Sequence, residues 1–511
     1  MTSRTDRSLA LQTEACQRAV RARDARFDGL IFVGITTTRV YCRPVCPARV
    51  SYPDRRRFFD SAAAAERAGF RPCLRCRPEL APGRALMDAV PRLARVAAHR
   101  IEAGALNGHG VADLAGELGV SERHLRRALE RELGVSPVEL AQTHRLLLAK
   151  RLLADTALPV TRIAFASGFQ SLRRFNSVFR ERYRMSPSAL RRAPRHSAGP
   201  GADARIAVEP PATGDQVHLT LAYRAPFAWD VLAALFRRDA IPGVGTFHGG
   251  RYLRTVELAG HFGVVAVGNA AMGEAAGRSA RSHLDVEISP SLLPALMPLL
   301  ARLRQLFDLD AEPAVVDACL AQGGLGALVR RYPGIRIPGA FDGFEVALCA
   351  LVRRSARAAG EPAETLRQVV AQLGEPVDTG VAGLDRMAPD AARVAEAGAS
   401  GLVALGLPRG RAESVAALAG EVASGSLRLE PGSDVDATRR ALRDIAGIGD
   451  RLATTIVMRA LYWPDAFPAS DAALQRAAGV SSAAELRERA EAWRPWRAYA
   501  ALQLWLADAG R

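Results

Sequence analysis

The sequence predicts a multidomain protein that is mainly α-helical, with smaller parts of mixed α+β structure. Its 511 residues exceed what one hydrophobic core accommodates, so we expect about three or four domains. Apolar residues recur at three- and four-residue spacing over 86–192 and from 291 onward, which is typical of amphipathic helices. Apolar and polar residues alternate in 218–223, 251–258 and 283–288, which predicts antiparallel strands.

Positive charge is concentrated near the N-terminus. Residues 1–200 contain 36 Arg and Lys against 18 Asp and Glu, whereas residues 201–511 contain 33 against 35. This asymmetry indicates a polyanionic partner, most often nucleic acid, although a generally arginine-rich surface is the alternative. The chain has neither a long apolar run nor a signal-peptide pattern, so we expect a cytoplasmic protein without a membrane segment.

Four of the seven cysteines form two close pairs. The pattern is Cys42-x3-Cys46, then 26 residues, then Cys73-x2-Cys76. In a cytoplasmic protein such pairs favour a metal over disulfides. Two thiolates from each of two turns complete the tetrahedron that Zn²⁺ prefers. The spacing alone leaves a purely structural zinc site open.

The residues around these cysteines resemble a known zinc domain. FVGITTTRVYCRPVCPAR (32–49) and GFRPCLRCRPE (69–79) resemble the N-terminal domain of the Ada alkylation-response family, which we place at 1–82. The resemblance implies that Cys42 irreversibly takes a methyl group from a methylphosphotriester in DNA. Zinc would keep the sulfur a thiolate, and the negative charge lost on methylation would strengthen DNA binding. The arginines that could hold phosphates there are Arg39, Arg43, Arg71, Arg75 and Arg77.

Two helix–turn–helix patterns follow at 111–137 and 160–187, with Gly119 and Gly168 at their turns. The second, IAFASGFQSLRRFNSVFRERYRMSPS, resembles the AraC-type regulators and implies a DNA-binding domain over 86–193 that acts with RNA polymerase at promoters. A basic helical bundle is the alternative. The apolar residues expected to face the core are Leu114, Leu118, Ile163 and Phe165. The residues that could reach DNA are Glu122, Arg123, Arg126, Gln170, Ser171, Arg173 and Arg174.

Residues 194–215 are rich in Pro, Gly and Ala and predict a linker. Beyond it, LRDIAGIGDRLATTIV (442–457) predicts a helix–hairpin–helix, in which Gly447 and Gly449 allow a turn whose amides bind a DNA phosphate. Together with FPASDAALQRAAG (467–479), WRPWRAYAALQLWLAD (493–508) and the strands, it resembles 3-methyladenine DNA glycosylase II of the AlkA type. The resemblance implies a sheet domain at 216–300 and a glycosylase domain at 301–511, acting on double-stranded alkylated DNA.

By this resemblance Asp471 is the catalytic carboxylate, stabilising the sugar cation while an alkylated purine such as 3-methyladenine leaves. An N-cap aspartate without chemistry is the alternative. Tyr499 and Trp505 would line the base pocket. Arg451 occupies the hairpin position that bifunctional relatives use for Schiff-base chemistry, and the only lysine, Lys150, lies elsewhere. We therefore expect a monofunctional glycosylase.

The sequence also departs from the AlkA pattern. The family's Gly-Gln pair and the apolar wedge after it, which fills the gap of a flipped base, correspond to Arg353, Arg354 and Ser355. A serine cannot fill a base-sized gap, which leaves Arg353 or Arg354 to insert instead. Arg451 and Thr455 replace pocket aromatics. An arginine beside a cationic base is unfavourable unless it points away. Two hypotheses follow: a repair enzyme that is also an activator, or a regulator whose AlkA-like part binds DNA without cleaving.

We predict no chemical role for the remaining cysteines. A Pro-Cys-His-Arg signature of O6-alkylguanine methyltransferases is absent, and Cys319 and Cys349 lie in apolar helical runs that predict core positions. Cys16 is expected to be structural or exposed.

Overall fold

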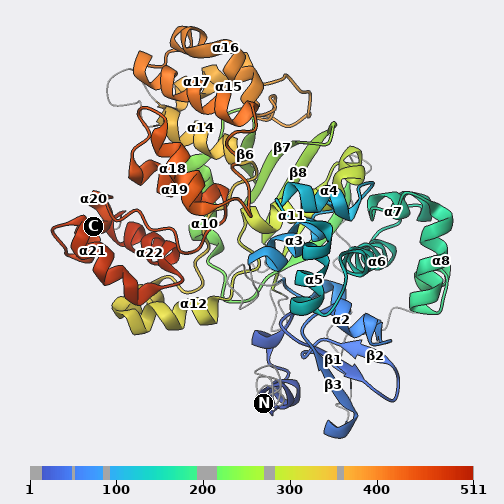
Figure 1. Cartoon of the computed structure of the whole chain (residues 1–511). Coiled ribbons are helices and arrows are strands. Elements are labelled where there is room, and N and C mark those ends of the chain that lie inside the picture. The colour runs from blue at the N-terminus through green and yellow to red at the C-terminus, as the bar shows by residue number, and fades with distance from the viewer. Residues whose placement is uncertain are drawn as a thin grey trace. The chain divides into compact units, whose positions relative to one another are not determined.

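The computed structural model describes residues 14–48, 52–83, 92–192, 216–269, 282–353 and 362–509. The chain forms two compact units (Figure 1). The first unit comprises Met1–Arg224 and Ala270–Ala301, and the second comprises Ala225–Asn269 and Arg302–Arg511. The predicted linker at 194–215 lies outside the described residues. Within the described part of the chain, no helix has the length and apolarity needed to cross a membrane.

The first unit begins with a small α+β module, as predicted. Its sheet has the order β3-β1-β2-β4, with β2 and β4 parallel and the other pairs antiparallel. The strands are β1 (Phe32–Ile35), β2 (Val40–Cys42), β3 (Arg56–Phe59) and β4 (Arg71–Pro72), with helix α2 (Ala62–Arg67) and the short helices η1 (Ala25–Phe27), η2 (Pro53–Arg55) and η3 (Pro78–Leu80). The core is small, built around Phe32, Tyr41, Ala65 and Phe70. A module with so little apolar burial depends on an additional staple such as a metal.

Seven helices follow and form the predicted double helix–turn–helix. They are α3 (Arg92–Glu102), α4 (Val111–Glu117), α5 (Glu122–Leu133), α6 (Pro137–Asp155), α7 (Val160–Ala166), α8 (Leu172–Tyr183) and α9 (Pro187–Arg192). Ser121 and Ser171 start α5 and α8 because their hydroxyls accept the amides of His124 and Arg174. The turns require glycine, since φ is +83° at Gly168 and +67° at Gly119.

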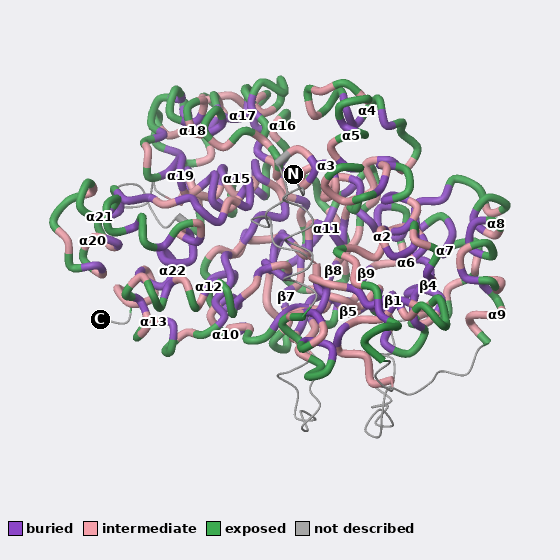
Figure 2. The backbone as a smooth tube through the Cα atoms, turned by 60° about the horizontal axis from the view of Figure 1, so that its bottom comes forward, coloured by how far each residue is buried: buried purple, intermediate pink, exposed green. Residues whose placement is uncertain are grey.

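The burial pattern corrects one expected core residue. Leu114 and Ile163 are buried and Leu118 is partly buried against the core, as expected. Phe165, however, is 53% exposed, because it lies on the outer face of α7, two residues from the buried Ile163. Buried and exposed stretches alternate along these helices in Figure 2.

All three predicted strands are present. In the first unit, β5 (Val217–Ala222) pairs antiparallel with β9 (His283–Ile288), followed by η5 (Pro290–Ala295). Helix α11 (Leu296–Leu306) begins in the first unit and ends in the second. In the second unit, β6 (Gly245–His248), β7 (Arg251–Leu258) and β8 (His261–Asn269) form an antiparallel meander after α10 (Trp229–Asp239).

The remainder of the second unit is helical. Its helices are α12 (Pro313–Leu320), η6 (Ala321–Leu325), α13 (Gly326–Arg331), α14 (Gly343–Arg353), α15 (Pro362–Leu373), α16 (Ala391–Ala404), α17 (Arg409–Ala423), α18 (Val435–Asp444), α19 (Asp450–Ala460), α20 (Ala472–Ala478), α21 (Ala483–Ala490), η7 (Glu491–Trp493) and α22 (Arg497–Ala509). A core of side chains from α14 to α19 fixes the hairpin between α18 and α19, with Ile445 and Ile448 of the hairpin inside it.

Candidate metal centre and carboxylate site

The two cysteine pairs meet at one place. Cys42 ends β2, Cys46 follows in the next loop, and Cys73 and Cys76 follow β4, the parallel neighbour of β2. All four sulfur atoms lie within 4.8 Å of one another. A tetrahedral zinc with Zn–S bonds of about 2.3 Å separates its sulfurs by about 3.8 Å, so the site fits this ion after small adjustments. Cys73 and Cys76 are buried, whereas Cys42 and Cys46 are partly exposed.

Hydrogen bonds from the Cys42 thiol lower the pKa of the Cys46 and Cys73 thiols, whereas the pKa values of Cys42 and Cys76 are raised, so the surroundings alone do not keep all four sulfurs as thiolates. The amide of Arg43 donates to Cys76 Sγ at 3.3 Å, and the amide of Arg75 donates to Cys73 Sγ at 3.4 Å. The neighbouring thiols, Cys46 first, together with burial, raise the pKa of the Cys42 thiol. Four adjacent thiolates therefore need a divalent cation, and sulfur ligands select Zn²⁺.

Two of the five arginines predicted to hold phosphates bind carboxylates instead. The guanidinium of Arg43 pairs with Asp28 and donates to the Cys76 carbonyl at 3.3 Å. Arg77 bonds to Glu79 at 3.0 Å and to Asp155 at 2.6 Å. Both side chains thus brace the cysteine loops.

The other three arginines keep their charge unpaired. Arg39 and Arg75 are exposed and Arg71 is half-buried, and none of them makes an ion pair within the described part of the chain. Arg39 stacks over Phe70 at 5.6 Å. These three remain the candidates for phosphate contacts.

Buried polar contacts join the cysteine module to the helix–turn–helix helices within the first unit. The carboxylate of Glu66, on α2, accepts the Tyr41 hydroxyl at 3.1 Å, the Thr143 hydroxyl at 2.9 Å and Arg182 at 2.9 Å. Thr143 lies on α6 and Arg182 on α8. The two modules therefore share a polar core.

Lys150 makes a second link that sequence reasoning missed. Its side chain, on α6, is 3% exposed, and its ammonium donates to Glu79 and, at 3.3 Å, to the carbonyl of Cys73. The signal was present in the sequence, because Lys150 is the only lysine among 69 basic residues. A compact ammonium fits a buried position between a carbonyl and a carboxylate that a planar guanidinium does not.

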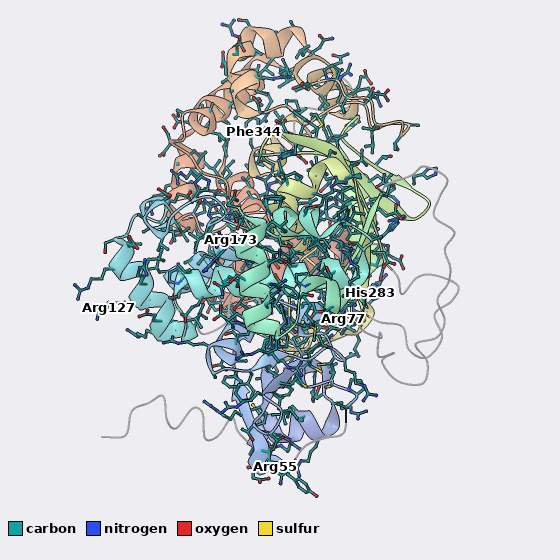
Figure 3. All side chains as sticks on the ribbon, turned by 90° about the vertical axis from the view of Figure 1, so that its right-hand side faces the viewer. Arg55, Arg77, Arg127, Arg173, His283 and Phe344 are labelled. Atoms are coloured by element: carbon teal, nitrogen blue, oxygen red, sulfur yellow. The ribbon has the colours of Figure 1, made fainter. Side chains whose placement is uncertain are left out.

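The predicted DNA-reading side chains point outward. Arg123, Gln170, Arg173 and Arg174 are exposed at the starts of α5 and α8, and Figure 3 looks onto the α8 side with Arg173 labelled. Exposed Arg126 pairs with Glu122 one turn earlier. The Ser171 hydroxyl already caps α8 by accepting the Arg174 amide at 3.3 Å.

In the second unit, Asp471 is buried at the N-cap of α20. Its Oδ1 accepts the amides of Ala473 at 2.9 Å and Leu474 at 3.3 Å, and its Oδ2 accepts Arg451 Nη1 at 2.7 Å. Burial alone would raise the pKa of this carboxyl, but hydrogen bonds from Arg451, Leu474 and Trp505 outweigh it and lower the pKa. Asp471 is therefore ionised at neutral pH.

The two predicted pocket aromatics lie on one helix but differ in burial and in the carboxylate that they approach. Trp505, on α22, is partly exposed and lies near enough to Asp471 to help lower the pKa of that carboxyl. Tyr499, one and a half turns earlier, is 3% exposed, and its hydroxyl donates to buried Asp308 at 2.8 Å. The structure thus brings Asp471, Arg451 and Trp505 together, and a pocket role for Tyr499 stays a prediction.

The hairpin between α18 and α19 has the expected glycines. Gly447 has a φ of +86°, and a Cβ there would lie 2.4 Å from Ser414 Oγ. That hydroxyl donates to the Ala446 carbonyl at 2.6 Å, which anchors the turn. Gly449 caps α19 with open space around it. The amides at the start of α19 are thus available to an anion.

Comparison with known proteins assigns each part. The model for the metal binding domain of Ada matches residues 15–79, a helix-turn-helix domain model matches 114–193, and the AlkA N-terminal domain model matches 218–342. A Mycobacterium tuberculosis protein, described as a probable bifunctional transcriptional activator/DNA repair enzyme AlkA, is 37% identical over 503 residues and 96% of both chains. The chain belongs to the family of Ada–AlkA fusion proteins.

Other similar proteins cover parts of this Ada–AlkA fusion. DNA-3-methyladenine glycosylase 2 of Escherichia coli is 31% identical over 290 residues, covering 57% of this chain and 97% of that protein. The regulatory protein ada of Salmonella typhimurium is 32% identical over 157 residues, covering 30% and 42%. A solved 3-methyladenine DNA-glycosylase from Archaeoglobus fulgidus aligns with a TM-score of 0.46 and 20% identity, over 57% of this chain and 98% of that one. A zinc-binding module, a transcription-regulator module and an AlkA-type module are thus present in one DNA-binding protein.

The Ada–AlkA fusion uses Arg353 differently from what the wedge hypothesis suggested. Arg353 donates at 2.8 Å to each of two carbonyls, those of Arg238 and Ala240, at the C-terminal end of α10. It therefore caps that helix end. The other two wedge positions, Arg354 and Ser355, lie outside the described residues. Thr455 donates to the Arg451 carbonyl at 2.9 Å within its own helix.

The remaining cysteines of the fusion are only partly as expected. Cys319 is half-exposed, with its thiol near the Arg494 carbonyl at 3.5 Å, so it is not a core residue. Cys349 packs against the core and lines a cavity of about 160 Å³. Cys16 is buried.

Proposed function

We propose that this Ada–AlkA fusion repairs alkylated DNA at two sites and reports the damage to transcription. Cys42 is the stoichiometric acceptor of a methyl group, and Asp471 is the carboxylate of a monofunctional glycosylase for alkylated purines of the 3-methyladenine type. The functional domains proposed are 1–82, 86–193, 216–300 and 301–511. The convergence of the four sulfurs at one partly exposed site carries the first activity.

In the methyl transfer, the Cys42 sulfur attacks the methyl carbon of a phosphotriester. A sulfur–carbon bond forms, the carbon–oxygen bond breaks, and its electron pair leaves with the phosphodiester oxygen. Zinc, when bound, supplies the charge that keeps the sulfur a thiolate at neutral pH. Partial exposure of Cys42 supports access of DNA, whereas buried Cys73 and Cys76 suit permanent ligands. Cys46 is assigned to the permanent ligands by the resemblance.

The methylated site loses one negative charge. Four thiolates and Zn²⁺ sum to −2, and three thiolates with a thioether sum to −1. Less repulsion of phosphate strengthens DNA binding beside exposed Arg39 and Arg75. We propose that this change promotes binding of the helix–turn–helix helices to promoter DNA, with RNA polymerase as partner, in the cytoplasm.

The zinc-loaded protein tests the acceptor. After exposure to methylated duplex DNA, peptide mass spectrometry should find one added methyl group on Cys42 and none on Cys46. Cys42→Ala should accept none, and the partly exposed Cys319 and Cys349, which lie outside the cysteine cluster, serve as internal controls in the same digest. A methyl group on another cysteine of the zinc-loaded protein contradicts the assignment.

In the excision, Asp471 stabilises the positive charge that develops on the sugar as the base departs. The carbon–nitrogen bond breaks with its electrons on the base, water adds its oxygen to the sugar carbon, and its proton leaves. The ionised state of Asp471 supports this role. Flipping of the base out of the helix precedes the reaction.

Release of 3-methyladenine or 7-methylguanine from methylated DNA tests the excision. The wild type should release both, and Asp471→Asn should lose at least about a hundredfold in rate. Asp390→Asn is a matched control, because Asp390 caps α16 in the same way at an exposed position. No release by the wild type would favour the alternative, a regulator whose AlkA-like part binds DNA without excising bases. The ion pair between Arg451 and Asp471 is the reason to test this alternative, because it occupies the proposed catalytic carboxylate.

A further inference from the structure

We infer that zinc at the cysteine site stabilises β5, the first strand of the AlkA-like part of the chain. The cysteine loops and β5 are connected within the first unit by two hydrogen-bonded links, one through Asp28 and one through helix α6. The metal of the sensor is then also a structural cofactor of the AlkA-like part. The inference goes beyond methyl transfer and base excision, and it requires neither Cys42 as the acceptor nor Asp471 as the catalytic carboxylate.

Asp28 provides the first link. Its carboxylate accepts Arg43 Nε at 2.8 Å, and its backbone carbonyl accepts Arg224 Nη2 at 3.1 Å. Arg43 directly follows Cys42, and its amide donates to Cys76 Sγ at 3.3 Å. Arg224 lies two residues beyond the end of β5, and both Arg224 and Asp28 are buried. Asp28 therefore joins the cysteine loops to the end of β5.

The turn that carries Asp28 is closely packed against its neighbours. Gly29 has a φ of +79°, and a Cβ there would lie 1.9 Å from the carbonyl oxygen of Pro82 and 3.3 Å from Arg224 Nη2. Only glycine permits this approach of two backbone segments. Pro82 follows the second cysteine pair in the chain, so the segments that flank both cysteine pairs meet at this turn. The position of Arg224 is thus fixed by packing as well as by its hydrogen bond.

Helix α6 provides the second link. Lys150 donates to the carbonyl of Cys73 at 3.3 Å, and the next residue, Arg151, donates through Nη2 to the carbonyl of Thr220 in β5. Lys150 and Arg151 are both buried. Successive side chains on a helix point about 100° apart, so one helix reaches the cysteine loop with one side chain and the strand with the next. This link is independent of Asp28 and meets β5 at a different residue.

Both links depend on closed cysteine loops. Their anchors, Arg43 and Cys73, belong to the two loops that a bound cation holds together, because four adjacent thiolates repel one another without it. A contact that is stronger in the zinc-loaded protein stabilises β5 when zinc binds. By linkage the same contact raises the affinity for zinc by the same factor. A hydrogen bond from a charged donor supplies a factor of about ten or more.

Two measurements on the full-length protein test the inference. The first is the affinity for Zn²⁺, determined by competition with a chromophoric chelator, and the second is hydrogen–deuterium exchange of β5 peptides with and without zinc. Arg151→Met, Arg224→Met and the double variant remove the links without changing a cysteine. Arg191→Met is the matched control, because Arg191 lies in the same unit and donates to a backbone carbonyl, that of Leu158, at 2.6 Å. Exchange in α5, which has its own apolar core, reports whether the rest of the unit is folded.

We expect each single substitution to weaken zinc binding about tenfold and the double variant about a hundredfold, whereas Arg191→Met stays within about twofold of the wild type. Zinc should slow exchange in β5 of the wild type by at least about tenfold and leave α5 nearly unchanged. In the double variant, exchange in β5 should no longer respond to zinc.

An unchanged zinc affinity of the double variant overturns the inference. Equal responses of α5 and β5 in the wild type overturn it as well, because zinc then stabilises the unit as a whole and not through these links. If one single variant loses protection in α5 even with zinc bound, it has failed to fold, and the other single variant decides by the same criteria. Neither measurement depends on methyl transfer or base excision, so failure here leaves the proposed function untouched.

Discussion

Replacing Lys150 by methionine removes the buried cation that joins the cysteine loop to α6. The ammonium donates to Glu79 and to the Cys73 carbonyl, and the side chains of Lys150 and Glu79 are 3% and 2% exposed. Breaking a buried ion pair by removing one partner costs about 3–5 kcal/mol, because a charge is left uncompensated. Arg77 still donates to Glu79 at 3.0 Å, so we expect about 3 kcal/mol, the lower end.

The two units offer separate probes for this change in the zinc-loaded, full-length protein. Every tryptophan lies in the second unit, so fluorescence during urea unfolding follows that unit alone. Hydrogen–deuterium exchange of peptides within α6 (Pro137–Asp155) follows the first unit. A loss of about 3 kcal/mol should accelerate exchange there by about a hundredfold, with the fluorescence transition unchanged.

A double variant separates the ion pair from packing. Glu79→Gln in the Lys150→Met background removes the stranded charge and should recover part of the lost protection. Unchanged exchange in α6 would refute the reasoning, as would a fluorescence transition that shifts by the same amount.

Three further substitutions test the second unit. Burial raises the pKa of Asp308 to about 6, so the folded protein binds this proton more tightly than the unfolded chain does. The resulting stabilisation is complete below about pH 4 and is lost as the pH rises through 6. The stability advantage of the wild type over Asp308→Asn should therefore shrink by about 3 kcal/mol between pH 4 and 7 in urea titrations, and a constant difference would contradict this. Gly447→Ala should lower the free energy of unfolding by about 1–3 kcal/mol and weaken DNA binding, because the φ of this residue is +86° and a Cβ there meets Ser414. Gly449→Ala, in open space, should lower it by only a few tenths of a kcal/mol. Equal effects of the two substitutions would argue against a strained turn. Arg353→Met removes two hydrogen bonds to the end of α10 and should cost about 1–2 kcal/mol by urea unfolding; an unchanged midpoint would show that this cap adds nothing.

Local sequence patterns predicted most of the helices and strands. The period of apolar residues located the helices and strands, because the side chains that face a core recur at the spacing of each element. The exposed Phe165 was the failure of this reasoning, since period alone does not say which apolar residue of a short helix faces the core.

The sequence did not predict which partners the charged side chains bind. Arg43 was a candidate for phosphate contacts, and its guanidinium binds Asp28; Arg353 was one of two candidates for insertion into DNA, and its guanidinium caps α10. An arginine has several possible partners, and the choice depends on which segments distant in sequence fold beside it.

The sequence by itself determined the four sulfur ligands, the hairpin glycines and the order of the modules, because short spacings and backbone requirements fix these locally. Only the tertiary structure decided what Lys150 and Arg451 do. Lys150 bonds to a segment 71 residues away, and Arg451 meets Asp471 across 20 residues. Burial there makes each charge depend on one particular partner, and that pairing is a property of the packed chain.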